Sequence, residues 1–434
     1  MSNQTLLNRS LQSVWHPCTQ MKHHENFPLI PIQRGEGVWL VDADGKRYLD
    51  AVSSWWVNLF GHNNPRIKEA IKLQLDTLEH VMLAGFTHEP VVNLSEKLAK
   101  LTGLGHAFYA SDGASATEIA LKMSFHYWRN TGKLLKTKFI SLKNSYHGET
   151  LGALGVTDVA IFKDTYAPLL MQSAQMPSPD FRLSAEGETA EDFALRCAHE
   201  LELYVNEHHA QLAAFIIEPL VQCAAGMAMY HPTYLRRARE ICTQYDVHLI
   251  ADEIAVGFGR TGTMFATEQA KVTPDFICLS KGITGGYLPL SAVLTTDKVY
   301  QAFYDDSTLK GFLHSHSYTG NPLACSAALA TLAIFESDLV LEKNKQTAAY
   351  LSNKAQAFNT LPIAHMRQQG MILAFDVQTN HTKFASACYA AALNQGLLLR
   401  PIGNTVYFMP PYTITESEVD FMIDATLGAL KQVL

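Results

Sequence analysis

The sequence predicts an α/β protein, with a large domain on a mainly parallel sheet and a smaller α+β domain formed from both ends of the chain. From about residue 105 to residue 300, short apolar runs alternate with segments of helical spacing, the pattern of successive strand–helix–strand units. The 434 residues suffice for about two to three domains. Apolar residues make up 47% and charged residues 17%, which is a globular balance.

Composition and charge argue against several classes of protein. The net charge is −7 and no basic cluster stands out, so neither nucleic acid nor a membrane surface is an expected partner. The seven cysteines are scattered and never in CxxC spacing, which indicates reduced thiols. The N-terminal residues lack a signal-peptide core, and no apolar run approaches the ~20 residues of a membrane span. We therefore expect a cytoplasmic protein.

The expected elements follow in a regular order. A hairpin turns at residues 42–45, and a helix starts after Asn63-Asn64-Pro65. Strand-like runs and helical patterns then alternate, at 106–111, 116–130, 138–145, 146–155, 212–220, 233–246, 247–253 and 275–281. The Ser-, Glu- and Pro-rich stretch 172–196 is expected to be a surface loop. After residue 325 the pattern is helical, with strands at 372–377 and 405–410 and a closing helix. We expect a small domain of residues 1–60 and 326–434 and a large domain of residues 61–325.

Two polar side chains follow buried runs about one strand–helix–strand unit apart. Asp252 ends an apolar run, and Lys281 follows the run 276–279. Open parallel sheets bind ligands beyond the carboxyl ends of their strands, so this carboxylate and this amine are expected to face one crevice. Pyridoxal phosphate requires such a pair, because the amine forms an imine with its aldehyde and the carboxylate keeps the pyridine nitrogen protonated. Taken singly, Asp252 also fits a helix cap, and Lys281 an ordinary surface lysine.

Further motifs have a functional and a plain interpretation. Gly113 opens a helix after a strand-like run, where free N–H groups bind a phosphate, although a capped helix is the ordinary alternative. Tyr146 either stacks on a flat ring or anchors a loop. Arg400 ends an apolar run, which suits two-pronged carboxylate binding, but a surface arginine fits as well. Trp55 and Trp56 would lie on opposite faces of the chain if this segment is extended.

Two motifs point away from other cofactors. GFGRTG at 257–262 matches the GxGxxG dinucleotide fingerprint, but its glycines do not follow a strand directly and an arginine lies inside it. The HxH at 314–316 has no third ligand of matching spacing, so no metal is expected. Ser317 is better explained as a hydroxyl for a phosphate.

Together these residues resemble the class III aminotransferases of fold type I. The resemblance is carried by IIEPLVQ, LIADEIAVGFGRTG, DFICLSKGITGG and SYTGNP, and it covers nearly the whole chain. Within the family, WHPCTQM, SSWW, HVMLAGFTH, GMAMYHP and LLLRPIGNTVYFMPPY are similar to members that act in biotin biosynthesis. The resemblance implies a seven-stranded-type sheet and pyridoxal 5'-phosphate as the cofactor.

The resemblance also implies residue roles. Lys281 would carry the cofactor as a Schiff base and shuttle the proton, Asp252 would pair with the pyridinium nitrogen, and Tyr146 would stack on the ring. The implied phosphate contacts are Gly113, Ala114 and Ser115, with His316 and Ser317 from the other subunit. The implied substrate contacts are Trp55, Cys18, Tyr146, Lys281, Ser315, Arg400 and Tyr407. Sites shared in this way imply a homodimer.

The implied reaction passes an amino group from S-adenosylmethionine to 8-amino-7-oxononanoate and gives 7,8-diaminononanoate by a ping-pong route. Alternatives are a class III transaminase of ω-amines or β-alanine, a lysine-using member, a cofactor-dependent aminomutase and a non-catalytic relative. The sequence departs from the family pattern at Cys18, Ala114, Glu149 and His316, and the first and third of these bear on the donor contacts. Glu218 is expected either to neutralise Arg400 in the empty site or to support the cofactor crevice.

Overall fold

The computed structural model describes residues 2–25, 27 and 29–434, and the chain forms two compact units. The small unit comprises residues 1–65, 346–366 and 373–434, and the large unit comprises residues 66–345 and 367–372. The boundaries expected at 60 and 325 thus lie at 65 and 345. The second boundary moves because α12 (Pro322–Ser337) packs against α4 (Glu89–Thr102) and so belongs to the large unit.

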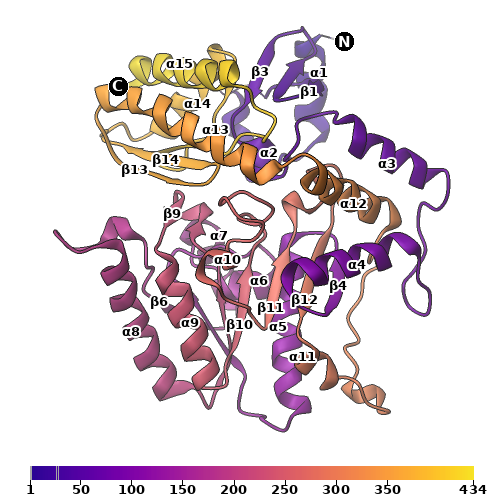
Figure 1. Cartoon of the computed structure of the whole chain (residues 1–434). Helices are drawn as coiled ribbons and strands as arrows, with labels where there is room; N and C mark the ends of the chain where they lie inside the picture. Colours follow the sequence, from indigo (N-terminus) through magenta and orange to yellow (C-terminus); the bar gives the residue numbers. More distant parts are fainter. Residues whose placement is uncertain (1, 26, 28) are drawn as a thin grey trace. The chain divides into compact units, whose positions relative to one another are not determined.

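The large unit is organised around a seven-stranded sheet (Figure 1). The strand order is β4 (His106–Ala110), β12 (Ser291–Thr295), β11 (Phe276–Leu279), β10 (His248–Asp252), β7 (Leu212–Ile217), β5 (Lys138–Leu142) and β6 (Ala174–Met176). Among these strands β12 alone runs antiparallel to its neighbours. The predicted mainly parallel sheet is therefore confirmed, and its carboxyl ends share one edge.

Helix α5 (Gly113–Asn130) covers one face of this sheet. Side chains alternate across a strand, so Ile250 on β10 and Cys278 on β11 join the same core cluster as Ile119 and Trp128 on α5. The buried indole nitrogen of Trp128 donates to a β7 carbonyl at 2.9 Å, so no polar atom of this ring is left unpaired. Because α5 follows β4 directly, its N-terminus lies at the carboxyl edge of the sheet.

The expectation of a surface loop across all of 172–196 is wrong near both ends of the stretch, while residues 177–180 and 184–189 have no helix or strand. This stretch contains the edge strand β6 and the start of α8 (Ala190–His208). Its polar composition belongs to the beginning of the helix, where the Thr189 side chain accepts from the Asp192 N–H and acidic residues occupy the first turn. Such residues also abound in loops, which is why composition alone misassigned them.

The helical pattern expected after residue 325 forms α12 and α13 (Val340–Ala355). Helix α12 begins at Pro322, and the Asn321 side chain caps it by accepting from the Ala324 N–H at 3.1 Å. Among the described residues no single helix is long and apolar enough to cross a membrane, and α12 meets that test only together with residues 340–360, as a pair bent by 74°.

The small unit contains the predicted hairpin in a four-stranded sheet of order β1 (Ile32–Glu36), β2 (Trp39–Asp42), β3 (Arg47–Asp50) and β15 (Leu397–Leu398). Strand β15 runs parallel to β3, with Leu398 opposite Asp50. The predicted strands β14 (Ile372–Val377) and β16 (Thr405–Phe408) form an antiparallel pair, and α15 (Glu416–Val433) closes the chain. Because β3 and β15 run parallel, the segments that follow these two strands start at the same edge of the small-unit sheet.

Candidate active site

Three ionisable groups converge at the carboxyl ends of strands in the large unit. Asp252 is the last residue of β10, Glu218 follows β7, and Lys281 comes two residues after β11. Burial lowers the pKa of the Lys281 ammonium group, and the nearby charge of Asp252 opposes this shift. Burial, followed by the negative charge of Asp252, raises the pKa of Glu218 well above its usual range. Because β7, β10 and β11 are adjacent and parallel, their carboxyl ends bring the three side chains to one edge of the sheet, as predicted for Asp252 and Lys281.

The carboxylate of Asp252 is held by its surroundings. Its Oδ2 lies 2.7 Å from Nδ1 of the buried His147, and its Oδ1 accepts the Ile254 N–H at 3.1 Å. The His147 backbone is fixed in turn, because its N–H donates to the Thr157 hydroxyl at 3.0 Å and its carbonyl accepts from Thr117 at 2.9 Å. Sequence reasoning did not assign His147 this role, since 105 positions separate it from Asp252.

Glu218 supports the crevice through backbone contacts. Its two carboxylate oxygens accept the N–H groups of Tyr146 at 3.0 Å and Cys223 at 3.3 Å. These bonds favour the expectation that Glu218 supports the crevice over the expectation that it neutralises Arg400. The Tyr146 hydroxyl donates to Glu149 at 3.0 Å, and its ring meets the ring of Phe162 edge-on, with centroids 5.6 Å apart. The chain after β5 is thereby tied to the chain after β7.

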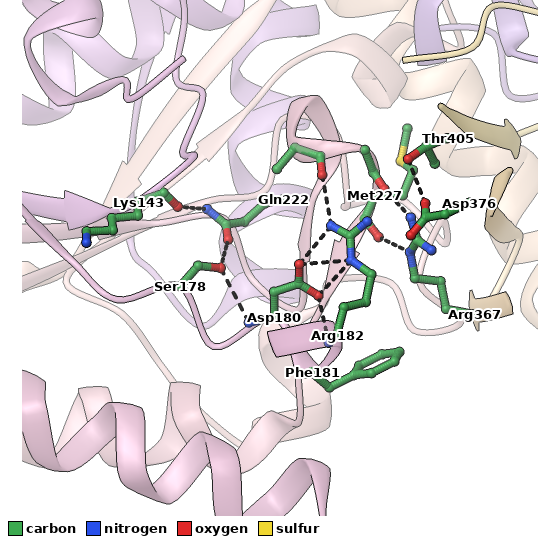
Figure 2. Close-up of polar contacts among 12 residues, drawn as sticks. Lys143, Ser178, Asp180, Phe181, Arg182, Gln222, Met227, Arg367, Asp376 and Thr405 are labelled. Carbon is green, nitrogen blue, oxygen red and sulfur yellow. Dashed lines mark hydrogen bonds and ion pairs between the residues drawn. The ribbon is translucent and has the colours of Figure 1, made fainter. Parts of the chain in front are cut away.

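Two arginines anchor the segment that follows Glu218 (Figure 2). Arg182 donates to the Ala225 carbonyl at 3.1 Å, and Arg367 donates to the Met227 carbonyl at 2.9 Å. Hydrogen bonds from a charged donor are roughly twice as strong as neutral ones. The backbone at residues 225–227 is therefore held by two arginines, one of which comes from a distant part of the sequence.

The N-terminus of α5 lies at the same sheet edge. Close contacts fix its first residues: a Cβ added at Gly148 would lie 2.5 Å from the Ala114 Cβ, and one added at Gly113 would lie 3.0 Å from Ile254. The first N–H groups of a helix have no intrahelical acceptor, so this end suits an anion. The Ser115 hydroxyl donates to the capping residue Asp112 at 3.0 Å, so it already has a partner.

GFGRTG forms a tight loop rather than a strand-to-helix phosphate turn. Phe258, Gly259 and Gly262 have φ of 54°, 87° and 103°. A Cβ added at Gly370 would lie 2.4 Å from the Thr261 carbonyl carbon, so the motif packs directly on the segment 367–372. The positive φ of Gly259 and Gly262 explains these two glycines without a dinucleotide, and the close backbone contact explains Gly370.

The small unit carries an unexpected left-handed helical turn, α2 (Ser53–Trp56). Its four residues have φ of 50°, 47°, 72° and 72°. An L-residue in this region costs roughly 1–2 kcal/mol, because its Cβ approaches the following carbonyl oxygen. The expectation that Trp55 and Trp56 alternate on an extended segment is therefore wrong. Nothing in the residue types signals such a turn, since serine and tryptophan rarely adopt positive φ.

Hydrogen bonds offset the strain of this turn. The Ser54 hydroxyl donates to Asp50 Oδ2 at 2.6 Å, and the Ser53 hydroxyl donates to the Met409 carbonyl at 2.7 Å. Asp50 is fully buried, and its Oδ2 also lies 3.1 Å from His62 Nε2. The turn is thus held by a buried carboxylate and a backbone carbonyl.

The turn places its two tryptophans in different surroundings. Trp55 is 43% exposed, and its ring lies 4.6 Å from the guanidinium carbon of Arg400. This contact follows from the β3–β15 pair, since the turn follows β3 and Arg400 follows β15. Trp56 is buried and donates to the hydroxyl of Tyr407 at 3.1 Å. Tyr407, expected at the substrate, is only 2% exposed and supports Trp56.

The other expected site residues lie on outer segments. Cys18 is an exposed thiol with a φ of 54°. Ser315 and Ser317 are exposed on the loop before α12, and His316 between them is half-buried. No group of three or more His, Cys, Asp and Glu side chains in the described ranges is arranged to hold a metal ion. The roles of Cys18 and of residues 315–317 stay predictions.

Known proteins share this architecture. The aminotransferase class-III family model matches residues 19–433. The adenosylmethionine-8-amino-7-oxononanoate aminotransferase of Helicobacter pylori is 49% identical over 418 residues, which is 94% of each chain. The crystal structure of the enzyme of that name from Methanocaldococcus jannaschii has a TM-score of 0.93 and 37% identity and covers 100% of both chains. An omega transaminase from Pseudomonas jessenii, solved in complex with PMP, has a TM-score of 0.94 at 30% identity, over 99% of this chain and 98% of its own.

The family match spans the strand-end residues Glu218, Asp252 and Lys281 as well as the turn beside Arg400. The predicted fold type I architecture is confirmed by these structures. This chain belongs to the class III aminotransferases.

Proposed function

We propose that the chain transfers an amino group from S-adenosylmethionine to 8-amino-7-oxononanoate in a ping-pong reaction that uses pyridoxal phosphate. The observation that carries the proposal is the 49% identity, over 94% of both chains, with the Helicobacter pylori enzyme whose name states these compounds. Omega transaminases have equally similar folds, but their identity is only 29–31%. Fold alone therefore does not separate the two substrate classes, whereas sequence identity favours the first.

The donor set of the large unit fits pyridoxal phosphate. Lys281 offers a buried amine for the aldehyde, Asp252 offers a carboxylate for the ring nitrogen, and the start of α5 offers N–H groups for the phosphate. Gly113 and Ala114 would supply these N–H groups. When bound, the cofactor supplies a carbonyl that exchanges its oxygen for the substrate nitrogen and a ring that accepts electrons from the substrate carbon.

The side chains of the large unit would hold and move the protons. A lowered pKa leaves the Lys281 amine unprotonated more often, so its Nζ can take a proton from the substrate carbon and return it. Asp252, oriented by His147, would hold a proton on the ring nitrogen. Tyr146, tied to Glu218 through its N–H, would cover the ring.

The small unit would recognise the substrates. A guanidinium binds a carboxylate through two parallel hydrogen bonds, and both proposed substrates carry a carboxylate. We assign this contact to Arg400, with Trp55 beside it covering the alkyl chain. Cys18 and Tyr407 would contribute less, because Cys18 is a short side chain and Tyr407 is buried.

A second copy of the chain would complete the assembly. Exposed apolar side chains flank residues 315–317: Leu309 is 89% exposed, Leu313 83% and Tyr318 65%. Tyr318 also contacts the ring of His80, with centroids 5.0 Å apart, which joins this surface to the segment carrying the exposed Phe86. Apolar surface of this extent is typical of a subunit interface. A homodimer would let Ser317 reach the partner's phosphate, and sedimentation should give twice the chain mass.

Product analysis tests the reaction. The purified holoenzyme is incubated with 8-amino-7-oxononanoate and either S-adenosylmethionine or lysine, and products are identified by mass spectrometry. We expect 7,8-diaminononanoate with S-adenosylmethionine and none with a Lys281→Ala control. Product formed only with lysine would identify a lysine-using enzyme. Activity confined to simple ω-amines with a keto acid would overturn the proposal in favour of an omega transaminase.

A further inference from the structure

The left-handed turn at Ser53–Trp56 needs an explanation, because strained backbone persists only where its surroundings fix it. Its side-chain anchor is the buried carboxylate of Asp50. That carboxylate accepts from the Ser54 hydroxyl at 2.6 Å, from the Val52 N–H at 3.3 Å and from His62 Nε2 at 3.1 Å. Three donors to one buried carboxylate fix its position.

The histidine in this network has a defined donor side. Asn58 Nδ2 lies 3.1 Å from His62 Nδ1, so the amide donates to Nδ1 and the ring proton resides on Nε2. Nε2–H then donates to Asp50. A chain of hydrogen bonds thus runs from Asn58 through His62 and Asp50 to Ser54, all within the small unit.

We infer that Asp50 is a positioning residue for substrate recognition: through Ser54 it holds the turn in its left-handed form and so keeps Trp55 against Arg400. The ring–guanidinium separation of 4.6 Å depends on the turn, because a right-handed or extended backbone would direct the Trp55 side chain elsewhere. The cation–π contact restricts Arg400 before a carboxylate arrives. This inference rests on the proposed role of Arg400 in carboxylate binding.

Two substitutions at one position separate the hydrogen bond from the backbone conformation. Ser54→Ala removes the hydroxyl but keeps a Cβ that disfavours positive φ, so the turn should relax. Ser54→Gly also removes the hydroxyl, but glycine adopts positive φ at little cost, so the turn should persist. The Ala variant should raise KM for both carboxylate substrates roughly tenfold with little change in kcat, and the Gly variant should stay within about twofold of wild type. A merely stabilising hydroxyl would give two variants with the same KM.

A second measurement reads the turn without any substrate. Acrylamide quenching of Trp55 fluorescence is obtained by subtracting the signal of Trp55→Phe, since the chain has five tryptophans. We expect greater quenching in Ser54→Ala and in Asp50→Asn than in wild type or Ser54→Gly. Unchanged quenching in Ser54→Ala would overturn the inference. If quenching changes but Arg400→Ala itself leaves KM unaltered, the inference about the turn holds and the proposed role of Arg400 fails.

Discussion

Each unit places side chains of the proposed site at the carboxyl ends of a parallel strand pair, but the two groups of side chains differ in strain and exposure. In the large unit, Asp252 ends β10 and is buried, and Lys281 follows β11. In the small unit, Trp55 and Arg400 follow β3 and β15 and both are exposed, but only Trp55 lies on a strained turn. Under the proposed function, the same topology serves chemistry, which needs fixed groups, and recognition, which needs access.

The largest loss of activity should come from substitutions in the large unit. Lys281→Ala should lower kcat by roughly 10⁴-fold, because a positioned proton-transfer group is lost and water replaces it poorly. Steady-state assays measure this, with circular dichroism to show that the fold survives. Borohydride treatment of the wild type should attach the cofactor to a peptide containing Lys281. A labelled peptide from elsewhere would remove Lys281 from the centre of the site.

Asp252→Asn should follow with a loss of about 10²–10³ in kcat, the usual cost of one oriented electrostatic partner. The amide cannot hold a cation on the ring nitrogen, although Lys281 still provides its amine. The measurement is single-turnover absorbance of the first half-reaction, with cofactor content determined separately. Turnover near that of the wild type would mean that Asp252 has only a structural role with His147.

The stability of the large unit should depend on pH through His248, which begins the strand β10 that Asp252 ends. The Ser124 hydroxyl donates to the Ala213 carbonyl and therefore accepts from His248 Nδ1 at 2.9 Å. Burial lowers the pKa of His248 from 6.5 to about 4. Between these values the unfolded chain binds a proton that the folded chain does not. Stability should thus be unaffected above pH 6.5 and fall by up to about 3 kcal/mol as the pH drops toward 4.

Urea unfolding of the holoenzyme at pH 7 and pH 4.5, at one protein concentration, gives the free energy of unfolding that each variant loses on acidification. The contribution of His248 is the difference between the losses of the wild type and the variant. His248→Gln keeps an amide for Ser124 but cannot titrate, so it should lose less stability than the wild type on acidification. His209→Gln, a change at an exposed histidine, is the matched control. Equal losses in wild type and His248→Gln would refute the assignment.

The smallest effect should come from substitution of the exposed Arg400 in the small unit. Arg400→Ala should cost roughly 2 kcal/mol in apparent binding of each carboxylate substrate, the typical value of a hydrogen bond to a charged group. Arg400→Lys should recover only part of this loss, because a point charge replaces a planar two-pronged donor. The KM values for the two half-reactions provide the test. If Arg400→Ala binds both substrates normally, the proposed role of Arg400 in carboxylate recognition is wrong.

Sequence reasoning predicted the parts that depend on periodicity and strand ends. The alternation of runs predicted the parallel sheet, and the positions of Asp252 and Lys281 after their strands predicted their proximity. It missed β6, which has only three residues and so shows little alternation. It also assigned no strand at β12, and the antiparallel direction of that strand leaves no mark in its composition.

The remaining misses concern contacts that span long sequence separations or strained backbone. The bond between His147 and Asp252 joins separate strand–helix units, and no local pattern encodes it. The turn at 53–56 is stabilised by Asp50 and Met409, so its conformation is a tertiary property rather than a propensity. For Glu218 the sequence left two alternatives open, because its bonds to the N–H groups of Tyr146 and Cys223 could not be predicted from side-chain types.

The segment 367–372 has a consequence for how the protein is made. It belongs to the large unit, where Arg367 binds the Met227 carbonyl and Gly370 packs on the Thr261 backbone. Domains tend to fold in order as the chain leaves the ribosome, at about 5–20 residues per second. A nascent chain ending at residue 345 would lack this segment, so the large unit cannot be completed until residues 346–366 of the small unit have also been synthesised. Translation therefore couples the maturation of the catalytic unit to that of its neighbour.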